Sequence, residues 1–204
     1  MTTVAAFDVD GTVTRRDCVV PFMRRVTGAR RVVPRLAARP DRLLPLVARR
    51  DRDQLKALAA AAAFRGQTEA TLLDEGIAFA DVVHADWLRS DTLQRLRAHL
   101  EAGDRVVFVS ASFEVYLRPL GALLGIDEAL GTRLEIRDGI ATGALDGPNC
   151  RGREKVRRLH EWLDHEDLDR AKVHVVAYGD SAGDRELLAD ADTAHWMTRD
   201  GRAA

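Results

Sequence analysis

A short apolar run near the N-terminus ends in two carboxylates, and this combination limits what the chain can fold into. Residues 4–7 (VAAF) have the composition of a buried strand, and Asp8 and Asp10 follow directly. Carboxylates at the end of a buried strand are costly unless a cation or a reaction uses them. In an extended chain, side chains two residues apart face the same side, so both carboxylates are predicted to share one site. An ordinary turn at Asp10-Gly11 would explain the same residues, so residues elsewhere in the sequence are needed to distinguish a functional site from a turn.

The remaining sequence alternates predicted strands and helices. Buried strands are expected at 105–109 and 173–178, and a hairpin with an Asp-Gly turn at 134–142. Helical patterns cover 17–28, 53–63, 68 towards 89, 90 towards 103 and 154–164, and another helix is expected to start near Gly183. This order predicts an α/β fold with a Rossmann-like parallel sheet and right-handed crossovers.

The first two predicted strands are separated by a long helical stretch. We therefore expect an α/β core formed by residues 1–14 and 90–204, with a helical cap inserted at 15–89. Ligands of parallel sheets bind at the carboxyl ends of the strands. The predicted strand-end residues are Asp8, Asp10, Ser110 and Asp180.

The polar residues at these strand ends suit phosphoryl transfer. A hard cation such as Mg²⁺ needs oxygen ligands, which Asp8, Asp10 and Asp180 can supply. Ser110 and the amide of Ala111, expected at a helix start, can donate hydrogen bonds to phosphoryl oxygens.

Two further residues complete this set. Lys155 would add a positive charge, and Asp184 adds a second carboxylate shortly after the third strand. A carboxylate that does not bind metal can attack phosphorus or carry a proton.

Four segments, taken in order, resemble the four motifs of the haloacid dehalogenase-like phosphatases. They are 8–12 (DVDGT), Ser110, Lys155 and 179–184 (GDSAGD). The helical insertion resembles the type 1 cap of the phosphoserine-phosphatase-like branch (subfamily IB), and 149–155 (NCRGREK) is also similar to that branch. The resemblance covers essentially the whole chain and implies a Mg²⁺-dependent phosphomonoester hydrolase.

The resemblance also implies a role for each motif residue. Asp8 would be the nucleophile that forms an aspartyl-phosphate, and Asp10 would protonate the leaving alcohol and later activate water. Mg²⁺ would lie on the Asp8 carboxylate, the Asp10 main-chain carbonyl and Asp180, with Asp184 in support. The phosphoryl oxygens would be held by Ser110, the Ala111 amide and Lys155.

The chain departs from phosphoserine phosphatases at three positions. Ala111 and Ser112 follow the serine where those enzymes carry two glycines, and Gly183 replaces an asparagine. Asp17 lies where they carry a substrate-binding glutamate, and it fits a helix N-cap as well as a substrate contact. We therefore expect a phosphorylated amino acid or amino alcohol, with phosphoserine and histidinol phosphate as candidates. A phosphotransferase acting on an alcohol acceptor and a non-catalytic regulatory module on the same fold are the alternatives.

Composition limits the kinds of binding partner and the cellular location that we expect for this protein. A net charge of −1 argues against a nucleic-acid partner. The partner that the resemblance implies is a small phosphate ester. The chain has no apolar stretch long enough to span a membrane and no signal-peptide pattern, and it has only two cysteines. We expect a cytoplasmic protein with reduced thiols. The sequence does not give the oligomeric state.

Residues 24–56 form a strongly basic stretch within the predicted cap. Eleven Lys or Arg and three Asp give it a net charge of +8. Three interpretations remain open: solvated helix faces, a basic cap that attracts anionic substrates, and weak association with anionic lipid. We expect no stable membrane association.

Overall fold

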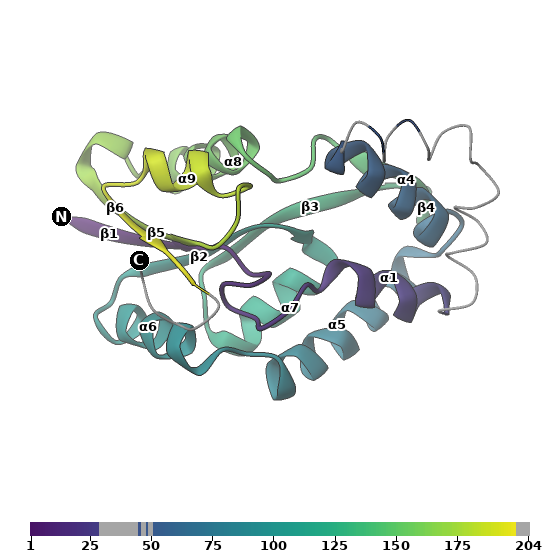
Figure 1. Ribbon diagram of the computed structural model, residues 1–204, viewed down its shortest axis with the longest axis horizontal. Coiled ribbons are helices and arrows are strands. Elements are labelled where there is room, and N and C mark those ends of the chain that lie inside the picture. Colours follow the sequence, from purple (N-terminus) through teal and green to yellow (C-terminus); the bar gives the residue numbers. More distant parts are fainter. Residues whose placement is uncertain (29–44, 46–47, 49–50, 199–204) are drawn as a thin grey trace.

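A six-stranded sheet forms the centre of the molecule (Figure 1). The computed structural model describes residues 1–28, 45, 48 and 51–198. The strand order is β4-β3-β2-β1-β5-β6, and every neighbouring pair is parallel except β3–β4. The strands are β1 (Thr2–Phe7), β2 (Arg105–Phe113), β3 (Glu128–Arg137), β4 (Ile140–Asp146), β5 (Val173–Gly179) and β6 (Thr193–Trp196). The predicted α/β fold class is confirmed, and the antiparallel pair is the predicted hairpin.

Helices cover both faces of this sheet (Figure 1). They are α1 (Val19–Thr27), α4 (Arg52–Phe64), α5 (Glu69–Asp86), α6 (Ser90–Glu101), α7 (Glu114–Leu124), α8 (Arg153–His165) and α9 (Arg185–Asp190). Helices α8 and α9 lie on one face, and α6 and α7 lie on the other. In the part of the chain that the structure describes, no helix has the length and apolar character needed to cross a membrane.

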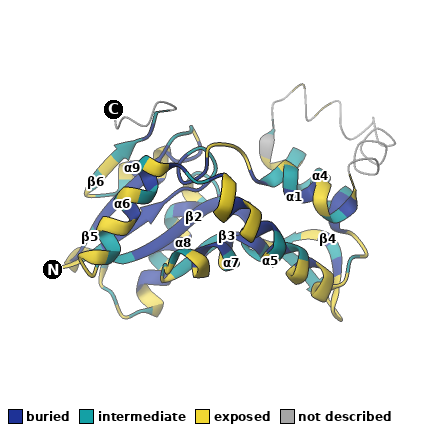
Figure 2. Ribbon diagram, turned by 90° about the horizontal axis from the view of Figure 1, so that it is seen from below, coloured by how far each residue is buried: buried dark blue, intermediate teal, exposed yellow. Residues whose placement is uncertain are grey.

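The alternation of side chains along β1 produces two separate cores. Val4 and Ala6 pack into the core beneath α8 and α9, whereas Ala5 and Phe7 pack into the core that faces α6 and α7. All four residues are fully buried, as is typical of a central parallel strand. Figure 2 shows buried residues concentrated in the central strands and exposed residues on the outer sides of the helices.

Most element boundaries agree with the sequence expectations within two residues. Thr68 caps α5, since its hydroxyl accepts a hydrogen bond from the Thr71 amide. One expectation is wrong: Ala111 does not lie at a helix start. Strand β2 continues to Phe113 and α7 begins only at Glu114, because pairing with β3 continues through Phe113 after a register shift. Strand β6 was not predicted.

The segment between α4 and α5 is attached to the hairpin. The Gly66 amide donates to the Ala141 carbonyl at 2.9 Å, and the Ala141 amide donates to the Gln67 carbonyl at 2.8 Å. These bonds hold α4 beside β4, beyond the carboxyl end of β1 (Figure 1). Most of the basic stretch 24–56 lies outside the described residues.

Candidate active site

The turn after β1 brings Asp8 next to the end of β5. The Asp8 amide donates to the Tyr178 carbonyl at 2.9 Å, and the chain then reverses at Gly11, whose φ is +88°. A Cβ atom at Gly11 would lie 2.2 Å from Asp180 Oδ2. The positive φ and this close approach both require glycine, and together they hold Asp8 and Asp180 side by side.

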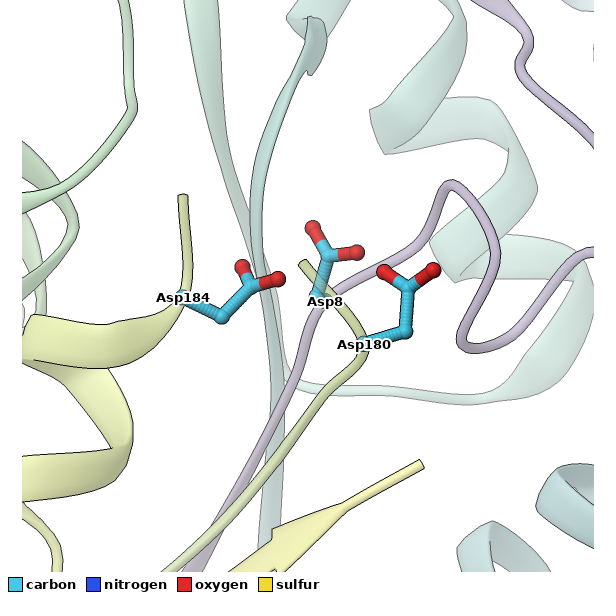
Figure 3. A group of neighbouring side chains, drawn as sticks. All are labelled: Asp8, Asp180 and Asp184. Carbon is cyan, nitrogen blue, oxygen red and sulfur yellow. The ribbon is translucent and has the colours of Figure 1, made fainter. Parts of the chain in front are cut away.

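Three carboxylates converge at this edge of the sheet (Figure 3). Asp8 follows β1, Asp180 follows β5, and Asp184 precedes α9. Each offers an oxygen atom, and these atoms all lie within 4.8 Å of one another. The sequence predicted all three as site residues, and the structure brings them together.

Lys155, in the first turn of α8, joins two of these carboxylates. Its Nζ atom donates to Asp8 Oδ1 at 2.6 Å and to Asp184 Oδ1 at 2.5 Å. Burial opposes the charge on Lys155, but the two carboxylates outweigh it and hold the Lys155 pKa above its ordinary value. Burial raises the pKa of Asp8 to about 7, and Lys155 opposes that rise. Lys155 therefore stays protonated and favours the ionised form of Asp8.

Asp180, a member of the same cluster, has an oxygen that forms no hydrogen bond with the described residues. The Oδ1 atom is buried and has no hydrogen-bond partner among the described residues. Burial, with the nearby Asp184 charge, raises the pKa of this carboxyl group. An unpartnered buried carboxylate oxygen beside two further carboxylates fits a hard divalent cation, and Asp8 and Asp180 would hold it.

Asp184 is already well satisfied by protein donors. Its Oδ2 atom accepts from the Ser181 amide at 2.9 Å and from the Ser181 hydroxyl at 2.8 Å, while Oδ1 accepts from Lys155. These contacts suit the supporting role that the sequence suggested for Asp184.

Asp10 turns its carboxylate away from this cluster. Its Oδ1 atom accepts from the Cys18 amide at 2.8 Å, and its Oδ2 atom accepts from the Ser112 hydroxyl at 2.8 Å. Burial, with the charge of Asp17, raises the pKa of Asp10 to about 6, although both hydrogen bonds oppose the rise. A carboxyl group with this pKa exchanges its proton readily near neutral pH.

A cavity of about 420 Å³ opens over these residues. Ser110 and Ala111 line it from β2, and Asp17 lines it from the segment before α1. The Asp17 carboxylate also accepts a hydrogen bond from the Val20 amide at 3.1 Å. Asp17 therefore stabilises the first turn of α1 and borders the cavity.

Lys56, for which no individual role was predicted from the sequence, extends from α4 into the same cavity. Its Nζ atom donates to Asn149 Oδ1 at 2.6 Å, to Thr132 Oγ1 at 2.8 Å and to the Ala111 carbonyl. Burial lowers the pKa of Lys56 to about 7, against the opposing effect of Asp10. The sequence did contain a signal for Lys56, because lysine is rare in this chain. Only three lysines occur, and one of the other two is the predicted site residue Lys155.

Comparison with known proteins places this site in a family. A family model described as haloacid dehalogenase-like hydrolase matches residues 5–189. Protein CicA of Caulobacter vibrioides is 36% identical over 202 residues, which span 98% of this chain and 88% of CicA. A Mycobacterium tuberculosis protein named phosphoserine phosphatase SerB1 is 29% identical over 209 residues, spanning 99% of this chain and 67% of SerB1.

The fold has solved counterparts as well. A structure of a Bordetella pertussis protein of unknown function superposes with a TM-score of 0.78 at 24% identity, covering 97% of this chain and 91% of that chain. The four ordered motifs, the sheet topology and the family match all agree. The chain therefore belongs to the haloacid dehalogenase-like hydrolases, in the phosphoserine-phosphatase-like branch that its motifs resemble.

Proposed function

We propose that this protein is a Mg²⁺-dependent phosphatase that hydrolyses a small phosphomonoester whose leaving group carries an amine. The observation that carries the proposal is the buried cluster at the strand ends. Lys155 bridges Asp8 and Asp184 there, while the Asp180 Oδ1 atom has no hydrogen-bond partner within the described part of the chain. A non-catalytic module has no need for this costly set of buried charges. The phosphatase name of the relative SerB1 is a further support.

The residues suggest a two-step route. An Asp8 oxygen forms a bond to phosphorus as the bond between phosphorus and the alcohol oxygen breaks, and Asp10 gives its proton to that oxygen. Water then forms a bond to phosphorus as the Asp8–phosphorus bond breaks, and Asp10 takes a proton from the water. Ser110 and Lys155 would hold the phosphoryl oxygens, and the amide of Ala111 would assist.

The metal would be held by the Asp8 and Asp180 carboxylates and the Asp10 main-chain carbonyl, with Asp184 in support. When bound, Mg²⁺ would neutralise charge on the phosphoryl oxygens. The Asp10 side chain is committed to Cys18 and Ser112, which leaves only its main chain for this purpose.

Substrate choice would come from the cap, residues 15–89. Asp17 and Lys56 border the cavity from this segment and carry opposite charges. A carboxylate at Asp17 suits a cationic amine on the leaving group, as in a phosphorylated amino acid or amino alcohol; phosphoserine and histidinol phosphate are the candidates. We also propose a cytoplasmic location, in keeping with Cys18 and Cys150, which are buried and unpaired.

The test is phosphate release from a panel of phosphomonoesters that includes p-nitrophenyl phosphate, phosphoserine and histidinol phosphate. We expect turnover with Mg²⁺, its loss on chelation, and a poor response to Ca²⁺, which prefers looser coordination. Asp8→Asn should lower turnover by several orders of magnitude, because it removes the nucleophile.

Two results would contradict the proposal. Near-normal turnover by Asp8→Asn at saturating Mg²⁺ would exclude the covalent route, and full activity in a chelated sample would exclude the metal. Adding an acceptor alcohol and analysing the products separates hydrolysis from phosphoryl transfer, since a transferase would form a new ester.

A further inference from the structure

Two buried hydroxyl groups form a hydrogen-bonded chain that ends on the Asp10 carboxylate. The Ser112 hydroxyl donates to Asp10 Oδ2 at 2.8 Å, and the Tyr116 hydroxyl donates to the Ser112 oxygen at 2.8 Å. Ser112 and Tyr116 have no exposed surface. Burial raises the Tyr116 pKa far above its ordinary value, so this hydroxyl remains a neutral donor.

From this arrangement we infer that Ser112 and Tyr116 are positioning residues that hold the carboxyl group of Asp10 in the orientation required for proton transfer. The inference rests on the proposed function, in which Asp10 is the acid and then the base. Neither hydroxyl touches the substrate or gains or loses a proton overall.

The direction of the hydrogen bonds follows from the chemistry of the groups. An ionised carboxylate only accepts hydrogen bonds, so the Ser112 proton must point to Asp10. The lone pairs of the Ser112 oxygen are then available to accept from Tyr116. This polarises the Ser112 hydroxyl and strengthens its bond to Asp10, as expected for a hydrogen-bond chain in a buried site.

Packing around Tyr116 fixes the position of the two hydroxyl groups. The Tyr116 ring packs against Phe22 of α1 and Phe79 of α5, with ring centroids 4.7 and 5.2 Å away. The other Asp10 oxygen is held by the amide of Cys18, directly before α1. Both oxygens of Asp10 are therefore held by groups that contact or adjoin helices of the predicted cap.

The Ser112 hydroxyl distinguishes this sequence from the typical pattern of the family branch that it resembles. The phosphoserine phosphatases that the sequence resembles carry glycine at the position of Ser112, and glycine has no hydroxyl to donate. Ser112 also donates its amide to Ser110 Oγ at 3.2 Å, so one residue contacts both the proton carrier and the expected phosphate ligand.

The experiment compares kcat/KM for two esters in Ser112→Ala, in Tyr116→Phe and in the control Tyr178→Phe. The Tyr178 hydroxyl lies 2.9 Å from His99 Nε2, away from Asp10, so this control loses a hydroxyl without touching the chain. One ester is p-nitrophenyl phosphate, whose leaving group needs little protonation, and the other is the alkyl phosphate that the panel shows to be hydrolysed fastest.

We expect Ser112→Ala to lower kcat/KM for the alkyl ester by about tenfold or more while changing that for the aryl ester by less than about threefold. Tyr116→Phe should also lower kcat/KM for the alkyl ester more than for the aryl ester, with a smaller effect. Tyr178→Phe should leave kcat/KM for both esters unchanged. Rapid quenching with p-nitrophenyl phosphate should show more phosphoenzyme in Ser112→Ala, because water activation also depends on Asp10.

If the wild type hydrolyses both esters but Ser112→Ala and Tyr116→Phe lower kcat/KM equally for the two, the inference is wrong and the proposed function stands. A wild-type protein that releases phosphate from neither ester would overturn the proposed function and the inference with it. Tyr116→Phe retains the packing of the ring, so it decides the question if Ser112→Ala does not fold.

Discussion

At the scale of single residues, Asp180 shows how burial creates a demand for a cation. Its carboxyl pKa is raised by burial, with a further contribution from Asp184, so the ionised form is disfavoured in the folded protein. The resulting loss of stability is absent below the ordinary pKa of an aspartate and is complete above the raised pKa. A metal ion bound to Asp180 would remove it.

Replacing this charge should therefore stabilise the metal-free protein. We expect Asp180→Asn to raise Tm in a chelating buffer at pH 8, with a gain that shrinks towards pH 4, and to reduce the rise in Tm that Mg²⁺ gives the wild type. Thermal unfolding with and without Mg²⁺ measures both effects.

Asp192→Asn is the matched control, because the pKa of Asp192 is shifted in the opposite direction to that of Asp180. The Val175 amide donates to Asp192 at 2.8 Å and lowers its pKa, so ionised Asp192 stabilises the fold at pH 8. This variant should lower Tm and keep the full response to Mg²⁺. An Asp180→Asn protein that responds to Mg²⁺ like the wild type would exclude Asp180 as a ligand.

At the scale of elements, two helices begin with the same motif but lie in different places. Asp17 accepts from the Val20 amide at the start of α1, and Asp51 accepts from the Gln54 amide at 3.0 Å at the start of α4. Of the two, only Asp17 lines the cavity of about 420 Å³. Comparing them separates helix capping from substrate recognition.

Asp17→Ala and Asp51→Ala should each cost about 1 kcal/mol of stability, because each removes a helix cap. We expect only Asp17→Ala to change substrate choice. Its kcat/KM for an amine-bearing phosphate should fall by about fivefold, corresponding to about 1 kcal/mol for an ion pair at an exposed carboxylate, and that for p-nitrophenyl phosphate should not change. An equal decrease of kcat/KM for the two substrates would show that Asp17 acts only as a helix cap.

At the scale of the whole molecule, the sequence predicts the fold class and the cluster of polar residues at the strand ends, because Asp8, Ser110 and Asp180 each follow an apolar run. The end of β2 could not be predicted in this way. The small residues at 110–112 (SAS) resemble the end of a strand, yet pairing with β3 carries the strand through Phe113. The contact between Lys56 and Asn149 joins residues 93 positions apart, and no local pattern predicts such a contact.

This contact connects α4 to the loop before α8 and is suited to control opening of the cavity. The Asn149 side chain accepts from Lys56 at 2.6 Å and donates to Asp53 at 2.6 Å, so one residue holds two positions of α4. Elsewhere, α4 is held near β4 by the main-chain bonds of residues 66–67. Loss of the Asn149 side chain should let α4 move away from the strand ends while its attachment to the hairpin persists.

We expect Asn149→Ala to speed amide hydrogen exchange in α4 by about tenfold, as anticipated for the loss of one or two net hydrogen bonds, and to leave exchange in β1 and β5 unchanged. Thr142→Ala, which removes a hydroxyl contact to Glu135 within the hairpin, is the control and should not affect α4. Exchange measured by mass spectrometry at the peptide level resolves these segments. Faster exchange throughout the sheet would mean that Asn149 supports the entire fold. Unchanged exchange in α4 would show that its other contacts, including the bonds from Lys56 to Thr132 and Ala111, hold this helix in place without Asn149.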